Sequence, residues 1–281
     1  MRRLISALCV MTGLAAGAGL WASPAAAQPF TPNEAGVTMG HWHLNSRDIE
    51  ANKRIFVALG GTPVKAGDFE IVRFPGVNVY LNLRPGTPAA TGGTVGSVIN
   101  HVGFLVQNVQ DSVAKWKSAG VPVLPGSNGR TDQAFVVTAD GLRIEILEDK
   151  DQKVPIRHHH VHFFVPETAI NDMQGWYGNL FGAKPGMRSN FKTGYVPGAE
   201  LAFSKTTEPT VTTKGRVLDH IGFDVNNMEE FMKKAEAAGV KPVVAPSKNP
   251  TNGVWLAFIA DPWGTYIEIN QRPNQTYLDQ M

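Results

Sequence analysis

Histidine is concentrated in one short stretch of this chain, where residues 157–165 read RHHHVHFFV. Imidazole nitrogens bind divalent metals and exchange protons near neutral pH. All eight histidines of the chain fall in or directly before four segments: GHWHLNS from Gly40, NHVGFLV from Asn100, HHVHFFV from His159 and DHIGFDV from Asp219. This clustering favours a chemical role over the structural role that a single histidine beside a strand usually has.

Two glutamates recur in a fixed register. The segments GLRIEIL from Gly141 and GTYIEIN from Gly264 each place a glutamate four residues after the glycine, at Glu145 and Glu268. In the related segments PGVNVYLN and PGAELAFS, the same position holds Tyr80 and Ala202. A carboxylate therefore ends only every second repeat.

An internal repeat positions these residues. His41 and His101 are 60 residues apart, and so are His160 and His220. After each histidine segment comes a helical pattern that ends at a glycine, followed by short extended runs separated by turn signals. Each of the four units is thus predicted to be a strand, a helix and about three further strands.

Four βαβββ units with histidine on the first strand and glutamate on the last resemble the vicinal oxygen chelate (VOC) superfamily, which includes glyoxalase I, fosfomycin-resistance proteins and extradiol dioxygenases. The resemblance covers residues 37–272. It implies an α+β fold in which units pair into two open β-sheet cups. We expect units one and two to form an N-terminal domain at 28–152, and units three and four a C-terminal domain at 153–273, followed by a tail at 274–281.

The resemblance also implies the metal ligands. In the C-terminal cup it gives the ligands His160, His220 and Glu268. In the N-terminal cup it gives His41, His101 and Glu145. Two histidines and one carboxylate leave positions open for substrate or water. Side chains two apart on a strand share a face, so His162 and His43 face the cups. We assign catalysis to His162 as an acid or base and to Glu268, and expect His158 and His159 at the rim.

Another metal-site pattern uses the paired histidines themselves. In cupin-like sites a glutamate follows the second histidine by four or five residues, and Glu167 follows His162 by five. Glu167 also stands at a predicted helix start, where a carboxylate is favourable in any case. We therefore prefer the ligand sets given above.

Three functions remain open. A bound divalent ion (Fe, Mn, Zn or Ni) would support a glyoxalase-like lyase or isomerase, or a dioxygenase, acting on a small substrate with adjacent oxygens. Extradiol dioxygenases have a tyrosine where this chain has Phe258, and glyoxalase I has a fourth protein ligand where it has Ala202 or Tyr80. The alternative is a sequestering protein of the bleomycin-resistance type, with tryptophans such as Trp42 lining the cup.

The N-terminus has the pattern of a secretory signal. Arg2 and Arg3 precede an apolar run that ends in Ala25-Ala26-Ala27, so we expect cleavage after residue 27 and a periplasmic or secreted protein. Cys9 lies in this signal, which leaves no cysteine for a disulfide. Without the two arginines of the signal, the chain has 24 basic and 24 acidic residues and a net charge of zero. We therefore expect neither nucleic acid nor membrane as a partner. The mature protein is expected to be a monomer or a homodimer.

Overall fold

The computed structural model describes residues 30–273, so the predicted signal and tail lie outside the described residues. Each unit has the predicted order of strand, helix and three strands. The elements are β1 (Val37–Leu44), α1 (Ile49–Leu59), β2 (Thr62–Ala66), β3 (Phe69–Phe74) and β4 (Val77–Tyr80) in unit 1; β5 (Ile99–Val106), α2 (Val109–Ser118), β6 (Val123–Pro125), β7 (Gln133–Val137) and β8 (Arg143–Glu148) in unit 2; β9 (Ile156–Val165), α3 (Ile170–Phe181), β10 (Lys184–Arg188), β11 (Phe191–Val196) and β12 (Ala199–Lys205) in unit 3; and β13 (Leu218–Val225), α4 (Met228–Ala237), β14 (Val244–Lys248), β15 (Trp255–Ala260) and β16 (Tyr266–Gln271) in unit 4. Within residues 30–273, no helix has the length and apolar character needed to cross a membrane.

The helices begin and end where their local chemistry predicts. The side chains of Asp48, Asn108 and Asn227 accept backbone N–H groups in the first turns of α1, α2 and α4, which satisfies donors that have no partner within the helix. Gly60 and Gly182 end α1 and α3 in the left-handed conformation, at φ values of 113° and 65°, where a side chain would be strained.

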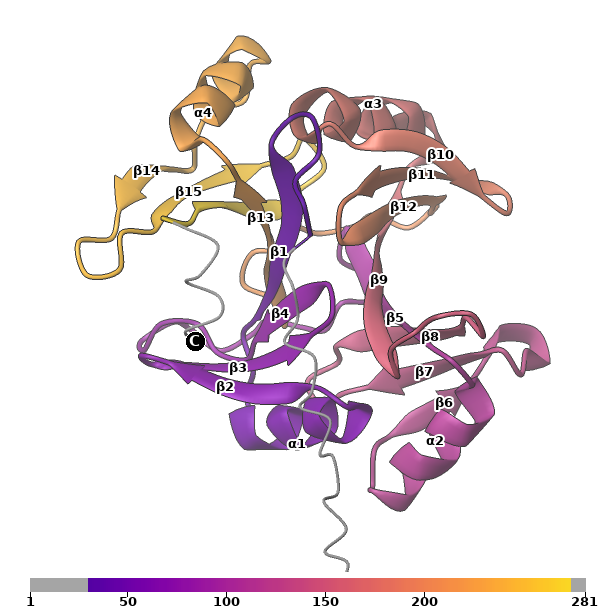
Figure 1. Cartoon of the computed structure of the whole chain (residues 1–281). Coiled ribbons are helices and arrows are strands. Elements are labelled where there is room, and N and C mark those ends of the chain that lie inside the picture. The colour runs from indigo at the N-terminus through magenta and orange to yellow at the C-terminus, as the bar shows by residue number, and fades with distance from the viewer. Residues whose placement is uncertain (1–29, 274–281) are drawn as a thin grey trace, which may run out of the picture.

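The pairing of the units differs from the prediction. One eight-stranded sheet has the order β14-β15-β16-β13-β1-β4-β3-β2, and the other has the order β10-β11-β12-β9-β5-β8-β7-β6. Unit 1 therefore shares a sheet with unit 4, and unit 2 shares a sheet with unit 3 (Figure 1). We call the two cups the 1/4 cup and the 2/3 cup. The expectation that units one and two form one cup, and units three and four the other, is wrong.

The centre of each sheet explains this pairing. The first strands meet in antiparallel pairs, with His43 opposite His220 in one sheet and His101 opposite His162 in the other. All four first strands have similar buried patterns, so their alternation does not select one partner over another. The short connection at 149–155 keeps unit 2 beside unit 3. The longer connections at 81–98 and 206–217 run together, joined by a bridge between Ser97 and Val211.

The core lies on the faces of the sheets away from the ligand histidines. Trp42 is fully buried, although His41 and His43 on either side of it point to the opposite face of β1. Its indole packs 5.2 Å from the Phe104 ring, between centroids, so the two sheets contact each other through these apolar faces. Trp42 therefore does not line a cup.

A buried hydrogen bond joins unit 3 to unit 4. The hydroxyl of Tyr177 on α3 donates to Asp261 Oδ2 at 2.9 Å, in the turn between β15 and β16. Both residues are buried, and burial raises the pKa of the Asp261 carboxyl. Loss of this donor would leave a buried carboxylate oxygen with one partner fewer.

We predict that Tyr177→Phe lowers the free energy of unfolding by about 1–3 kcal/mol. Urea denaturation of the variant and the parent, followed by fluorescence, measures this difference. Tyr195→Phe is the matched control, because Tyr195 is 51% exposed, and it should leave the midpoint unchanged. Equal midpoints for Tyr177→Phe and the parent would contradict the prediction.

Candidate metal centres

Two four-residue clusters contain all six predicted ligands. The ligand atoms of each cluster lie within 4.8 Å of one another; the clusters are His41, His43, His220, Glu268 and His101, Glu145, His160, His162. The first lies in the 1/4 cup and the second in the 2/3 cup. Each cluster thus combines a strand with two clustered histidines, β1 or β9, with the first and last strands of unit 4 or unit 2.

The predicted sets must therefore be regrouped. His160 was expected with His220 and Glu268, but it lies with His101 and Glu145. His41 takes its place beside His220 and Glu268. The chemical type of each set, two imidazoles and a carboxylate, is unchanged. This correction follows directly from the pairing of β1 with β13 and of β5 with β9.

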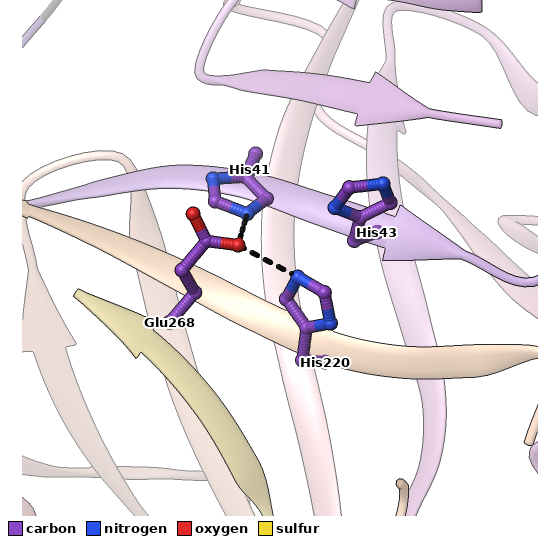
Figure 2. A group of neighbouring side chains, drawn as sticks. All are labelled: His41, His43, His220 and Glu268. Carbon is purple, nitrogen blue, oxygen red and sulfur yellow. Dashed lines mark hydrogen bonds and ion pairs between the residues drawn. The ribbon is translucent and has the colours of Figure 1, made fainter. Parts of the chain in front are cut away.

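In the 1/4 cup, Glu268 is the point on which His41 and His220 converge, with His43 beside them (Figure 2). Its Oε2 atom lies 2.9 Å from His220 Nε2 and 3.6 Å from His41 Nε2. The His43 ring is 4.6 Å from the His220 ring, between centroids. His43 Nε2 lies 2.7 Å from the carbonyl oxygen of Asn82. Because a carbonyl only accepts, Nε2 carries the proton and Nδ1 keeps its lone pair.

The 2/3 cup repeats this arrangement around Glu145. Its Oε2 atom lies 3.1 Å from His160 Nε2 and 3.3 Å from His101 Nε2. His162 Nδ1 lies 3.1 Å from His101 Nε2, while its Nε2 lies 2.8 Å from the hydroxyl of Ser204. All four clustered side chains are buried.

These distances fit a bound metal ion. Metal–nitrogen and metal–oxygen bonds of about 2.1 Å place neighbouring ligand atoms roughly 3.0–3.4 Å apart. The separations in both cups span this range or lie close to it. His160 Nε2 is buried and lies 3.1 Å from Glu145 Oε2 without meeting hydrogen-bond geometry, so a cation held by both atoms would satisfy this nitrogen. The residues present therefore fit a divalent cation in each cup.

The charge state of the clusters also suits a cation. Burial lowers the pKa of His43, His160 and His162 well below the usual value, so these imidazoles are neutral at pH 7. Burial opposes ionisation of Glu145 and Glu268, but the interactions with the adjacent histidines outweigh it and hold both pKa values well below normal. Neutral imidazole and ionised carboxylate are the forms that bind metal.

His220 differs from His43, His160 and His162. Burial alone would lower its pKa, but hydrogen bonds to Asp219 and Glu268 raise it to about 9. Its Nδ1 atom donates to Asp219 Oδ1 at 2.7 Å. In the other cup, His101 Nδ1 lies 2.9 Å from Asn100 Oδ1. A carboxylate or amide behind a ligand histidine fixes the ring orientation; the residue directly preceding each histidine was the available sequence signal.

Each glutamate is held by an amide that we did not predict. Asn270 Nδ2 donates to Glu268 Oε1 at 2.7 Å, and Gln133 Nε2 donates to Glu145 Oε1. The two amides occupy opposite strands of equivalent cross-strand pairs. Asn270 is the β16 residue of the pair Leu256–Asn270, whereas Gln133 is the β7 residue of the pair Gln133–Leu147. The pairs became recognisable only when the strand register was known.

The different positions of the two amides predict that one substitution weakens metal binding and that a second restores it. Asn270→Leu should weaken metal binding in the 1/4 cup about 10–100-fold, because Glu268 loses the donor that orients it. Adding Leu256→Gln recreates the arrangement of the 2/3 cup and should recover most of the affinity. Competition with a chromophoric chelator measures both values. Unchanged affinity in Asn270→Leu, or no recovery in the double variant, would show that the amide does not orient the carboxylate.

Two glycines allow the imidazoles to approach the neighbouring strand. A Cβ atom on Gly222 would overlap the His41 ring, and one on Gly103 would overlap the His160 ring. Both glycines occur in the repeated H-x-G segments. Neither glycine has a positive φ angle, so glycine is not needed here for its backbone conformation. Its role is to leave space for the imidazole.

The two cups differ at the position where a fourth ligand was considered. Tyr80 lies opposite His43, with its ring 5.1 Å from the His41 ring, between centroids. Burial raises the pKa of its phenol, which therefore stays protonated at neutral pH. The equivalent residue in the 2/3 cup is Ala202, opposite His162. Only the 1/4 cup has a phenol at this position.

Of the two histidines expected at the rim, one lies elsewhere. His158 was expected at the rim, but it is buried in the core 4.9 Å from Trp42, between ring centroids. A register shift in the pairing of β9 with β5 turns it to the opposite face from His160. His159 is partly buried, and its Nδ1 lies 2.8 Å from His160 Nδ1.

The cupin-like alternative is not supported. Glu167 is outside the His162 cluster, and its carboxylate pairs with Lys205 at 3.3 Å on the surface. Phe258 faces the 1/4 cup, with its ring 5.2 Å from the His220 ring between centroids, so it is a cup residue rather than a core residue.

A cavity of about 910 Å³ lies between α4 and the outer side of its sheet. Met232, Val240 and Trp255 contribute to its lining, and it shares no residue with either histidine cluster. Because its chemistry is mainly apolar and its position is on the far face of β16, we do not assign the metal chemistry to this cavity.

Comparisons with known proteins agree with this fold. Residues 161–269 match the model of the Glyoxalase/Bleomycin resistance protein/Dioxygenase superfamily. A search of curated proteins gave no match. The chain is similar to glyoxalase I from Zea mays, with 17% identity, a TM-score of 0.67 and coverage of 87% of this chain and 95% of that chain.

A second similar structure is a proposed dioxygenase from Bacillus subtilis, with 13% identity, a TM-score of 0.65 and 91% of each chain covered. At these identities the likeness establishes the fold, and the family match covers units 3 and 4. Residues 161–269 therefore carry a domain of the Glyoxalase/Bleomycin resistance protein/Dioxygenase superfamily, and the described chain has the VOC fold, built as two cups.

Proposed function

We propose that this chain is an exported, metal-dependent VOC enzyme that acts on a small molecule with two adjacent oxygens. The observation that carries the proposal is the convergence, in each cup, of three imidazoles and one carboxylate within 4.8 Å. Their burial, the ionised carboxylates and the neutral imidazoles of His43, His160 and His162 suit a divalent cation such as Fe, Mn, Zn or Ni. Such an ion, when bound, polarises oxygens attached to it.

The chain's own residues supply ligands and proton carriers. In the 1/4 cup His41, His220 and Glu268 hold the ion, and the Tyr80 phenol beside them can donate a proton. In the 2/3 cup His101, His160 and Glu145 hold it. His162 is the proposed acid or base there, because its Nδ1 faces the cluster while Ser204 holds its other nitrogen.

Turnover on a defined panel tests this function. The protein from Gln28 onward is reconstituted with each of the four metals and incubated with α-hydroxycarbonyl compounds and catechols, with and without dioxygen. We expect product with at least one metal and none after chelation. A sequestering protein would instead show saturable binding without product, and a protein that neither binds metal nor forms product would refute the proposal.

Export is part of the same proposal. Residues 1–27 are the proposed secretory signal, and the mature enzyme is proposed to be periplasmic or secreted. Cell fractionation with mass spectrometry of the mature N-terminus tests it. A protein that keeps Met1 and stays in the cytosol would contradict it.

A further inference from the structure

The two cups have equivalent ligands but different walls. In each cup, two phenylalanines flank the ligand cluster, one on either side: Phe191 and Phe135 in the 2/3 cup, and Phe69 and Phe258 in the 1/4 cup. The residues packed on or paired with these phenylalanines differ between the cups. That difference bears on which substrates each cup can accept.

On one side of the 2/3 cup, the guanidinium of Arg188 lies over a phenylalanine. Its Cζ atom is 4.7 Å from the centroid of Phe191, and the Phe191 ring lies 5.1 Å from the His162 ring. Arg188 pairs with Phe191 across β10 and β11, so both project from the concave face of the sheet. The guanidinium is thus one aromatic ring away from the metal cluster.

The other side of the same cup repeats this arrangement. Arg143 Cζ lies 4.1 Å from the centroid of Phe135, whose ring is 6.3 Å from the His101 ring. Arg143 precedes Glu145 by two positions on β8, so it also faces the cup. Among the described residues, no carboxylate forms an ion pair with Arg143. Two guanidinium groups therefore flank the cluster.

Arg188 has an unused donor. Its Nε donates to Glu200 Oε1 at 2.6 Å, and Glu200 lies opposite His160 on the cup face. The Nη2 atom is buried and has no hydrogen-bond partner within residues 30–273. A buried guanidinium nitrogen without an acceptor is costly, and an anionic ligand in the cup would supply the acceptor.

The 1/4 cup lacks both of these arginines. Ala66 pairs with Phe69 where Arg188 pairs with Phe191. Tyr266 stacks on Phe258, 4.8 Å between centroids, where Arg143 covers Phe135.

The cations near the 1/4 cup are otherwise engaged. Arg272 donates to Asp224 at 3.0 Å, so its charge is balanced within the wall. Lys214 lies 4.7 Å from the centroid of Tyr266, but it is exposed and stays hydrated. In the part of the chain described, both cups therefore have an ion-paired arginine in the wall, Arg272 with Asp224 and Arg188 with Glu200. The 2/3 cup differs in having Arg143 over Phe135 and a buried Nη2 of Arg188 without an acceptor.

We propose that the 2/3 cup is specific for a substrate that carries a carboxylate in addition to its two metal-binding oxygens. Arg188 and Arg143, on opposite sides of the cluster, attract this carboxylate, and they act as specificity-determining residues. The 1/4 cup makes no such selection and accepts the uncharged relative equally well. This inference rests on the proposed function, since it concerns a ligand of the same metal centres.

A matched pair of probes tests the proposal. The probes are 3,4-dihydroxybenzoate and 3,4-dihydroxybenzamide, which share two adjacent hydroxyls and differ in one charge. Each is titrated by calorimetry into Mn(II)-loaded protein with a single intact cup. His41→Ala with His220→Ala leaves the 2/3 cup, and His101→Ala with His160→Ala leaves the 1/4 cup.

We expect the 2/3 cup to bind the carboxylate at least about tenfold more tightly than the amide, the typical effect of charge-assisted hydrogen bonds. Arg188→Gln and Arg143→Gln should each reduce that ratio while leaving the amide affinity unchanged. Lys192→Gln is the control, because Lys192 pairs with the core residue Phe203 and points to the other face. It should keep the full ratio.

The outcomes separate this proposal from the one it rests on. Binding of both probes with equal affinity in the 2/3 cup overturns the specificity and leaves the metal-dependent function standing. Failure of metal-loaded protein to bind either probe overturns both. If Arg188→Gln does not fold, because Glu200 loses its partner, Arg143→Gln and the comparison of the two cups still decide the question.

Discussion

A chain with both His160→Ala and His220→Ala is expected to bind no metal, whereas a chain with His41→Ala and His220→Ala is expected to keep one ion. His160 and His220 belong to different cups, so the first variant damages both sites. His41 and His220 belong to one cup, so the second variant leaves the other intact. Loss of one imidazole removes a ligand from a buried set and leaves the carboxylate without its partner.

Elemental analysis after reconstitution and desalting measures the ions per chain. The parent is expected to hold two, and the single variants one each. Pairing of the units in sequence order would give the opposite result for the two double variants, because His160 and His220 would then share a site. Circular dichroism spectra that match the parent ensure that the loss reflects the site rather than the fold.

Gly222→Ala is expected to empty the 1/4 cup without removing any ligand. The added methyl group would occupy the position of the His41 imidazole, and the backbone of β13 is fixed by its pairing with β1. His41 must then leave the cluster. Since disturbing residues that only support ligands costs about 10–100-fold in affinity, displacing a ligand should cost at least as much.

The controls for this prediction lie in the same chain. Gly103→Ala should empty the 2/3 cup instead, because its methyl group would overlap His160. Gly175→Ala has open space around the added methyl group and should leave both ions in place. Chelator competition on the three variants distinguishes the cups. Retention of parental affinity in Gly222→Ala would mean that His41 is not a ligand.

The local architecture of each unit could be predicted from the sequence. Strand, helix and three strands are specified by nearby residues, such as the caps Asp48 and Asn227 and the glycines after the helices. The side chains that face a cup followed from alternation along β1 and β9. These features depend on interactions between residues that are close in the sequence, which is why the sequence is sufficient to predict them.

The partners of those residues could not be predicted in the same way. Whether His160 meets Glu145 or Glu268 depends on which first strands pair, and the four strands have nearly the same buried pattern. The amide donors were missed because Gln133 and Asn270 become equivalent only across a strand pair. His158 was misplaced because a register shift in β9 reverses its face.

Local sequence patterns therefore predicted the repeated unit, the type of ligand and the face of the strand to which each ligand points. The assembled fold joins unit 1 to unit 4 and unit 2 to unit 3, which no local pattern indicates. It also decided that Arg188 and Arg143 flank one cup but not the other. Strands with similar burial patterns can form the same backbone hydrogen bonds with any of the others. The connections between units and the shared core therefore select which strands pair.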